Sequence, residues 1–308
     1  MDSLASGLRA WTPVWIRTAG APVVDWAVLG GPIADPFFEQ TAEREMRHPF
    51  NQLFARETPL GALEEIAAAE PSVPPSGFVF HMSRCGSTLV AQMLAGLPSS
   101  IVLSEAQPFA AVLELHRERR LGDDAAAGAL RGLAAALGRP RYGETRLFVK
   151  FHASHVLDLP LIARAFPGVP WVFLFREPRA VLRSHARALG AETFAAASGD
   201  VPDERNAESA VAAYCEAALR HAGVGSSLFV DYAELPGAVC ERILPFFGVE
   251  LDDGAADALR AIARRDTKRP GDFTARADAG EAPNLDALAV PRLDPAYAAL
   301  KRRAARAA

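Results

Sequence analysis

Apolar residues in the middle of the chain form short continuous runs, and each run is followed by apolar residues at helical spacing. Trp171–Phe175 is wholly apolar, which is typical of a parallel strand covered on both faces. Shorter runs lie at residues 78–81, 147–149 and Ser227–Asp231, and the alanine-rich stretch Asp123–Leu137 is predicted as a helix. Alternating strands and helices predict an α/β fold in which a central parallel sheet is flanked by helices. The helices that follow the strands are expected at residues 89–97, 157–166, 180–189 and 238–247.

The N-terminal quarter of the chain follows a more mixed pattern. Its proline-rich end at residues 71–75 cannot continue a helix. We therefore predict an N-terminal cap or accessory segment at residues 1–76 and a separate α/β domain at residues 77–308. Within the segment we expect two short strands and an amphipathic helix, at residues 11–16, 23–29 and 36–46.

Composition and charge narrow the class of protein. The 308 residues are 50% hydrophobic, enough for a sizeable core. The 33 basic and 37 acidic residues lack the basic excess of a nucleic-acid-binding protein. Three widely spaced cysteines favour reduced thiols over a disulfide framework. We find no signal peptide and no run of ~18 apolar residues, and therefore expect a cytoplasmic protein without a membrane span.

A loop of small and polar residues connects the strand at residues 78–81 to the next helix. Such a loop gathers free backbone N–H groups at the positive end of the helix dipole, which suits a phosphate. Gly86 allows close backbone approach, and Arg84 adds a permanent cation. An ordinary strand–helix turn with a solvated arginine is the alternative. The candidate phosphate-binding residues are Ser83, Arg84, Cys85, Gly86, Ser87 and Thr88.

The residues around this loop argue against a kinase. The chain contains no Gly-Lys pair, which a Walker A loop requires. Arg176 directly follows the predicted strand Trp171–Phe175, at a position where a kinase usually carries a magnesium-binding carboxylate. An arginine there indicates a second anionic group on the ligand. Asp231 is the residue placed like a metal-binding carboxylate, and we interpret it as a strand-end cap. We expect no metal site.

Two motifs resemble those of bacterial-type members of the sulfotransferase superfamily. Residues 83–89 are similar to its 5′-phosphosulfate loop, in which Lys or Arg precedes Ser-Gly-Thr-Thr or a close variant. Residues 173–184 resemble its R-[DN]-P-[RK]-D-x-x-x-S element. The resemblance implies that Arg176 and Ser184 hold the 3′-phosphate of 3′-phosphoadenylyl sulfate (PAPS). It also implies a P-loop-like three-layer fold, and transfer that needs no metal.

Two further segments extend the resemblance to residues 77–273. Residues 229–236 are similar to V-x-Y-E-D-L, which implies an adenine contact for Tyr232, although Ala233 departs from the pattern. A late loop is similar to R-K-G…G-D-W, which closes over the 3′-phosphate, and a solvated basic loop is its alternative. Its candidate residues are Lys268, Arg269 and Gly271.

The catalytic candidates follow a strand and a second motif. Lys150 ends the strand at residues 147–149 and resembles the family lysine that reaches the sulfuryl group, while Arg84 would stabilise charge on the leaving phosphate. Lys150-Phe151-His152 resembles the K-x-H of cytosolic small-molecule sulfotransferases, whose histidine deprotonates the acceptor. Glu105 lies where protein-tyrosine sulfotransferases carry a catalytic glutamate. We favour His152 slightly as the base, because it comes directly after the lysine that is expected to contact the sulfuryl group.

The predicted function is therefore in-line transfer of the PAPS sulfuryl group to a hydroxyl or amine. The acceptor stays open among small molecules, lipids, glycans and peptides, because fold analogy does not transfer substrate. One alternative is a P-loop-type kinase or phosphotransferase that uses Arg84 in place of lysine and Asp231 as metal ligand. The other is a non-catalytic nucleotide-binding protein.

Overall fold

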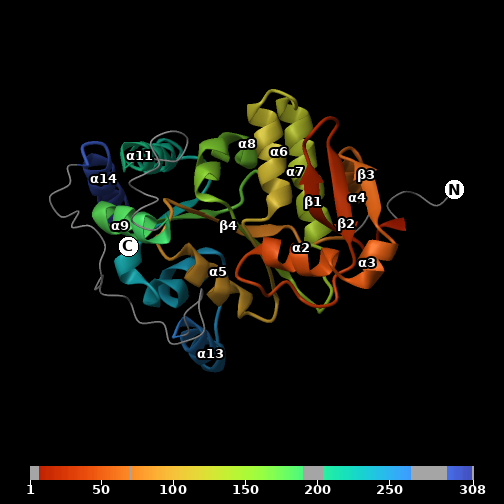
Figure 1. Ribbon diagram of the computed structural model, residues 1–308. Coiled ribbons are helices and arrows are strands. Elements are labelled where there is room, and N and C mark those ends of the chain that lie inside the picture. The colour runs from red at the N-terminus through yellow and green to blue at the C-terminus, as the bar shows by residue number, and fades with distance from the viewer. Residues whose placement is uncertain (1–6, 70, 190–203, 265–289, 307–308) are drawn as a thin grey trace. The chain divides into compact units, whose positions relative to one another are not determined.

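The computed structural model describes most of the chain in two compact units, which are taken in turn (Figure 1). The first unit comprises Met1–Phe78 and Leu94–Val169, and the second comprises Val79–Met93 and Pro170–Ala308. The predicted boundary between residues 76 and 77 stays a prediction. The described residues are 7–69, 71–189, 204–264 and 290–306.

A five-stranded sheet lies among helices, and its strand order is β5-β6-β4-β7-β8. The pairs β5–β6 and β7–β8 are parallel, so the predicted α/β fold with a parallel sheet is confirmed. The strand β4 begins at Pro75, inside the predicted proline-rich boundary, because proline is tolerated as the first residue of a strand. The strands are β4 (Pro75–His81), β5 (Ser100–Ser104), β6 (Arg146–Lys150), β7 (Trp171–Phe175) and β8 (Ser227–Asp231).

The first unit begins with a small antiparallel sheet. The predicted strands at its start are present as β1 (Thr12–Arg17) and β2 (Val23–Ala27), and β3 (Arg56–Pro59) pairs with β2. The indole Nε1 of Trp26 donates to Thr58 Oγ1 at 2.9 Å, which ties β2 to β3 inside the core. The predicted mixed N-terminal segment is therefore a three-stranded sheet with accompanying helices.

Helices of the first unit pack on this sheet and on one another. The predicted alanine-rich helix is present as α7 (Asp123–Leu137), and it packs against α4 (Ala62–Ala69) and α6 (Gln107–Arg117). An ideal Cβ on Gly132 would lie 2.5 Å from the Leu63 carbonyl oxygen, so the close approach of α7 to α4 requires glycine there. In the part of this unit that the structure describes, the remaining α-helices are α2 (Phe38–Met46), α3 (Pro49–Leu53) and α8 (Leu159–Ala165).

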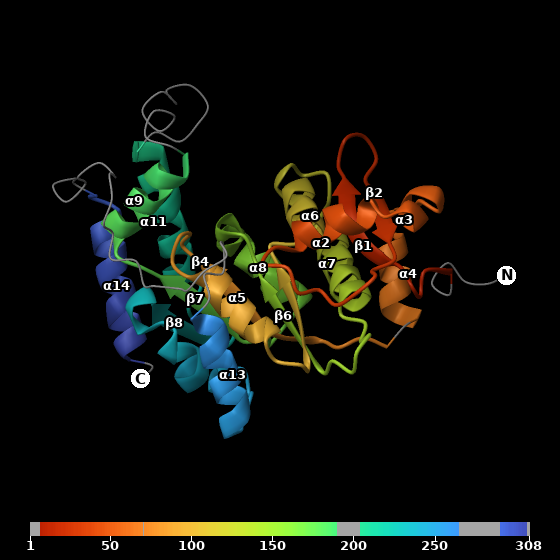
Figure 2. The ribbon, with the colours of Figure 1, turned by 60° about the horizontal axis from the view of Figure 1, so that its bottom comes forward.

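The second unit contains the strongest predicted strands. The bounds of β7 and β8 match the sequence prediction. Figures 1 and 2 show three helices of this unit side by side, namely α9 (Pro178–Leu189), α11 (Glu204–Arg220) and α14 (Leu293–Ala305). The other α-helices among the described residues of this unit are α5 (Ser87–Ala95), α12 (Leu244–Phe246) and α13 (Asp253–Ala263).

The helix predicted at residues 238–247 differs in the structure. A π-turn over Val239–Ile243 leads into the short α12, which ends at Phe246. The cause is Pro245, which has no N–H with which to continue an α-helical ladder. No helix in the described part of the chain has the length and apolar character needed to cross a membrane.

Candidate active site

The phosphate loop between β4 and α5 has an unusual backbone. Ser83 and Arg84 have φ angles of 78° and 51°, and Gly86 has a φ of 84°. Left-handed conformations at non-glycine residues cost on the order of 1–3 kcal/mol each and cluster at ligand-binding sites. The Cys85 side chain is buried, and its Sγ donates to the Leu174 carbonyl oxygen at 3.2 Å. The thiol therefore anchors the loop to β7, and the ligand-facing contribution of Cys85 is its backbone.

Gly86 is required by a close packing contact as well as by its backbone angle. An ideal Cβ there would lie 2.7 Å from Leu235 Cδ1 and 3.0 Å from Tyr232 Cδ2. The distance to Leu235 is shorter than real Cβ contacts and that to Tyr232 is tight, so any larger residue requires the Leu235 and Tyr232 side chains to move. The predicted phosphate residue Gly86 and the predicted adenine residue Tyr232 therefore lie side by side.

Two arginines meet at this loop. The Arg84 Nε donates to Ser184 Oγ at 2.9 Å, and its Nη2 donates to the Ser184 carbonyl oxygen at 3.1 Å. The Arg176 Nη1 donates to the Arg84 carbonyl oxygen at 3.3 Å, and the Arg176 guanidinium lies 4.2 Å from the centre of the Tyr232 ring. The pKa of Arg84 is lowered by burial and, to a smaller extent, by the charge of Arg176. Two partly buried cations this close create a site that suits a multiply charged anion.

The structure thus brings together the predicted donor-site residues Arg84, Gly86, Arg176, Ser184 and Tyr232. Ser87 and Thr88 are buried in the first turn of α5. The contact between Arg84 and Ser184 joins two motifs that are far apart in the sequence. The predicted donor residues that lie outside the described part of the chain are Lys268, Arg269 and Gly271.

The catalytic candidates Lys150 and Glu105 form a partly buried ion pair in the first unit. In the parallel register Ser104 pairs with Lys150, and the Glu105 N–H donates to the Lys150 carbonyl oxygen at 2.8 Å. The Lys150 side chain is 1% exposed, and its Nζ donates to Glu105 Oε1, while the Glu105 side chain is 23% exposed. The backbone of Glu105 has a positive φ of 52°, which is a strained conformation for a residue other than glycine.

His152 lies at the start of a short turn. Its Nδ1 lies 3.0 Å from Ser154 Oγ and accepts the Ser154 N–H at 3.4 Å, so the ring caps the 3₁₀ turn Ala153–Asp158. The His152 side chain is exposed, and its ring centre lies 5.7 Å from that of the buried His155. Of the two candidate bases, Glu105 is the one that contacts the Lys150 ammonium.

Asp231 acts as a cap, which confirms the sequence interpretation. Its carboxylate accepts the Ala233 N–H at 3.0 Å and the Tyr297 hydroxyl at 3.1 Å, and it pairs with Lys301 at 3.2 Å. Burial, together with Asp231, raises the pKa of Tyr297 to about 12. These contacts occupy the carboxylate that a kinase would need for a metal ion. The described residues contain no group of three or more His, Cys, Asp or Glu side chains that could hold one.

Sequence patterns did not indicate one neighbour of the candidate pair Lys150–Glu105. The Lys150 Nζ lies 4.9 Å from the centre of the Phe37 ring. Phe37 belongs to the N-terminal segment and lies in none of the motifs described above. The single sequence signal near it is the predicted helix at residues 36–46, which places Phe37 at a helix start.

Comparison with known families agrees with the motifs. The model of the sulfotransferase family matches residues 75–253, which is more than half of the chain. The chain belongs to the sulfotransferase family, and it is a PAPS-dependent enzyme by family. The predicted family and enzyme class are therefore confirmed.

Several solved structures are similar to the chain. The sulfotransferase domain of the Synechococcus PCC 7002 olefin synthase is 20% identical, covers 77% of this chain and 96% of its own, and has a TM-score of 0.45. Sulfotransferase STF9 from Mycobacterium avium is 14% identical, covers 83% of this chain and 81% of its own, and has a TM-score of 0.49. The comparison with curated proteins finds no match.

Proposed function

We propose that the protein transfers the sulfuryl group of PAPS to a hydroxyl or amine of an acceptor molecule. The observation that carries this proposal is the convergence of Arg84 and Arg176 on one strained loop at a helix start. Two permanent cations beside a glycine with no room for a side chain form a cradle for a ligand with more than one phosphate.

The residues of the second unit fit the donor. The backbone N–H groups at the start of α5 and the Arg84 guanidinium suit the phosphosulfate end, and Arg176 with Ser184 suits a 3′-phosphate. Tyr232, whose ring lies beside Arg176 and Gly86, is the aromatic residue that we assign to the adenine. When bound, PAPS supplies a sulfuryl group attached to a phosphate leaving group.

The chain's own contribution to transfer comes from Lys150 and Glu105. The buried Lys150 ammonium donates hydrogen bonds where negative charge develops, and the Glu105 carboxylate accepts the proton that the acceptor loses. We place the base at Glu105, reversing the order that the K-x-H resemblance favoured. The support is the direct contact of Glu105 with Lys150, whereas His152 uses Nδ1 to cap its own turn.

Calorimetry with 3′-phosphoadenosine 5′-phosphate (PAP) tests the donor assignment. We expect binding in the presence of EDTA, and binding of adenosine 5′-monophosphate that is weaker by at least ~10-fold, because charge-assisted bonds to the 3′-phosphate are missing. Binding of ATP that requires magnesium, with no gain from the 3′-phosphate, would favour the kinase alternative.

A transfer assay separates an enzyme from a non-catalytic nucleotide-binding protein. The protein is loaded with PAPS and offered a panel of hydroxylated small molecules, lipids, glycans and tyrosyl peptides. We expect one product that gains the mass of a sulfuryl group. Tight binding of PAP with no product from any acceptor class would favour the non-catalytic alternative.

A further inference from the structure

Phe37 brings an aromatic ring from the N-terminal segment onto the predicted transfer centre. The ring centre lies 4.9 Å from Lys150 Nζ, which is within the range of a cation–π contact. Lys150 is almost fully buried, whereas Phe37 and Glu105 are partly exposed. The partly exposed ring and carboxylate therefore flank the same buried ammonium.

The position of Phe37 is held by its own helix start. Its N–H donates to Gln40 Oε1 at 3.3 Å, and the Gln40 N–H donates to the Phe37 carbonyl oxygen at 3.1 Å. The next residue, Phe38, is completely buried in the core. Since α2 is anchored through Phe38, the backbone of Phe37 has little freedom to turn away.

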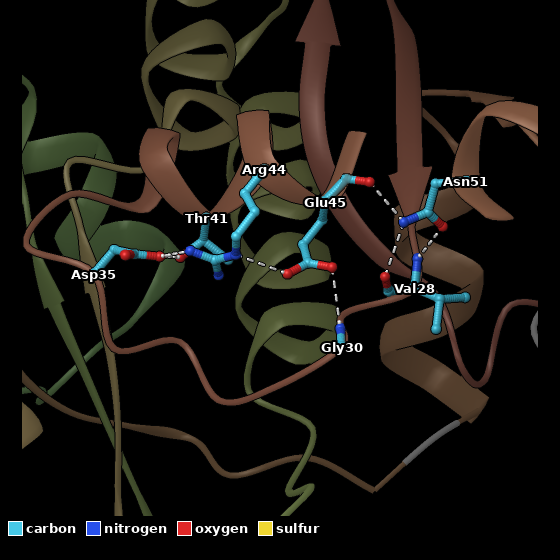
Figure 3. A network of polar contacts seen from close by, with 7 residues as sticks. All are labelled: Val28, Gly30, Asp35, Thr41, Arg44, Glu45 and Asn51. Atoms are coloured by element: carbon cyan, nitrogen blue, oxygen red, sulfur yellow. Dashed lines mark hydrogen bonds and ion pairs between the residues drawn. The ribbon is translucent and has the colours of Figure 1, made fainter. Parts of the chain in front are cut away.

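A polar network fixes the loop that leads to Phe37 (Figure 3). Asp35 accepts from Thr41 Oγ1 at 2.6 Å and from Arg44 Nη1 at 2.6 Å, and Glu45 accepts the Gly30 N–H at 3.1 Å. These bonds tie both ends of the loop to α2. The Phe37 ring therefore belongs to a segment that is fixed by hydrogen bonds and ion pairs.

We propose that Phe37 determines acceptor specificity by selecting a hydroxyl carried on an aromatic or aliphatic frame over one carried on a sugar. This inference rests on the proposed roles of Lys150 and Glu105. The acceptor oxygen must come within about 3 Å of the Glu105 carboxylate to lose its proton. We place the carbon that bears this oxygen beside the Phe37 ring, because the ring and the Glu105 carboxylate both contact the Lys150 ammonium.

The chemistry of the ring decides which carbon frames are favoured there. Apolar atoms gain from burial against an aromatic face. A sugar hydroxyl placed there loses its hydrogen bonds to water and finds no acceptor or donor on the ring. We therefore expect the wild-type protein to prefer apolar alcohols by at least tenfold in kcat/KM.

The test uses the full chain and three acceptor probes, 2-naphthol, 1-octanol and methyl β-glucoside, at saturating PAPS. Product is quantified by mass spectrometry for the wild type, Phe37→Ala and Phe37→Leu. We expect Phe37→Ala to reduce the preference for the two apolar alcohols roughly tenfold, mainly through their KM. Phe37→Leu restores most of the preference, because it keeps an apolar wall.

Phe54→Ala is the matched control. It removes the same ring from the same N-terminal segment, but Phe54 is 57% exposed and packs on Phe50, with ring centres 5.0 Å apart. We expect its acceptor preference to equal that of the wild type. An unchanged preference in Phe37→Ala, or an equal loss in Phe54→Ala, overturns the inference.

The wild-type preference can still overturn the inference if Phe37→Ala does not fold, which thermal unfolding reports. Preferred sulfation of methyl β-glucoside, or PAP binding with no sulfation of either apolar alcohol, overturns the inference. Sulfation of the sugar alone leaves the proposed function standing. Loss of PAP binding together with loss of all transfer instead overturns the proposed function itself.

Discussion

The phosphate-loop region of the second unit and the Lys150 region of the first unit are built in different ways. Arg84, Gly86 and Arg176 lie in or directly after short motifs that the sequence displays, and contacts with Leu174, Arg176 and Ser184 hold the loop. Lys150 and Glu105 meet only because two parallel strands align, and Phe37 joins them from a third segment. The residues of the proposed donor site can therefore be named from local motifs, whereas those of the proposed transfer centre are recognised as a group only in the assembled fold.

The two regions also differ in their use of charge. The phosphate-loop region places like charges together, since Arg176 lowers the pKa of Arg84 in addition to the effect of burial. The Lys150 region pairs a buried ammonium with a partly exposed carboxylate. The first arrangement suits a ligand of fixed negative charge, and the second suits a step in which a proton moves.

The largest expected effect is a loss of turnover when the Glu105 carboxylate of the Lys150 region is replaced. Glu105→Gln keeps the size and a hydrogen bond to Lys150 but cannot accept a proton, so turnover should fall by roughly 10²–10⁴-fold. PAP affinity by calorimetry should change less than about twofold, because the donor residues are untouched.

His152→Gln is the paired control for that measurement. Because His152 caps a turn, its replacement should leave turnover within about threefold of the wild type. A large loss in His152→Gln with normal turnover in Glu105→Gln would return the base to His152.

The next largest effect is expected on the Kd for PAP, which tests the phosphate-loop region. Arg176→Ala removes a charged donor and the partner of Tyr232, so the Kd for PAP should rise by roughly 10–100-fold. Arg292→Ala removes a surface arginine paired with Glu216 in the same unit and should change the Kd less than about twofold. Equal effects of the two substitutions would mean that only overall charge matters.

A smaller effect isolates the close packing of the loop. Gly86 and Gly143 have φ angles of 84° and 86°, but only Gly86 would place a Cβ against Leu235 and Tyr232, while nothing lies within 4 Å of a Cβ on Gly143. Both Gly→Ala changes should cost about 1 kcal/mol of backbone strain, and Gly86→Ala a further ~1–3 kcal/mol from overpacking. Urea unfolding measures both, and equal losses would show that the contact with the loop after β8 is not needed.

The smallest effect concerns the helix that packs on the donor region. The pKa of Tyr297 is raised to about 12 from a usual value of 10, so the folded state keeps its proton longer than the unfolded chain. Its stabilising contribution is therefore full below about pH 10 and is lost as the pH rises toward 12.

Tyr297→Phe removes both the hydrogen bond to Asp231 and this titration. The variant should be less stable by about 1 kcal/mol at neutral pH, and the difference from the wild type should shrink between pH 10 and 12. Denaturant midpoints across this range measure it. A difference that stays constant with pH would contradict the assignment.

The predictable parts of the fold were those with strong continuous patterns. β7 is wholly apolar, and β8 carries a continuous Leu-Phe-Val run, so their bounds followed from the sequence. β3 was missed because its Arg-Glu-Thr-Pro sequence has no apolar run. β5 was also missed, although its three apolar residues between serines form a pattern as strong as that of β8. The pairing that makes these segments strands comes from distant partners.

The candidate site shows the same division. Motif residues such as Arg84 and Arg176 could be named from the sequence because their spacing within a strand–loop–helix unit is fixed. The contact of Glu105 with Lys150 required the register of β5 against β6, and the ring of Phe37 required the anchoring of α2. No local pattern carries that information.

The most direct measurement is transfer of a labelled sulfuryl group from PAPS by the wild type and by Lys150→Met at saturating donor. Methionine keeps the buried volume of Lys150 and removes its charge, with PAP calorimetry as the check on the donor site. We predict labelled product from the wild type, a loss of at least ~100-fold in Lys150→Met, and unchanged PAP binding. Undiminished transfer by Lys150→Met would contradict the assignment of the Lys150–Glu105 pair as the transfer centre.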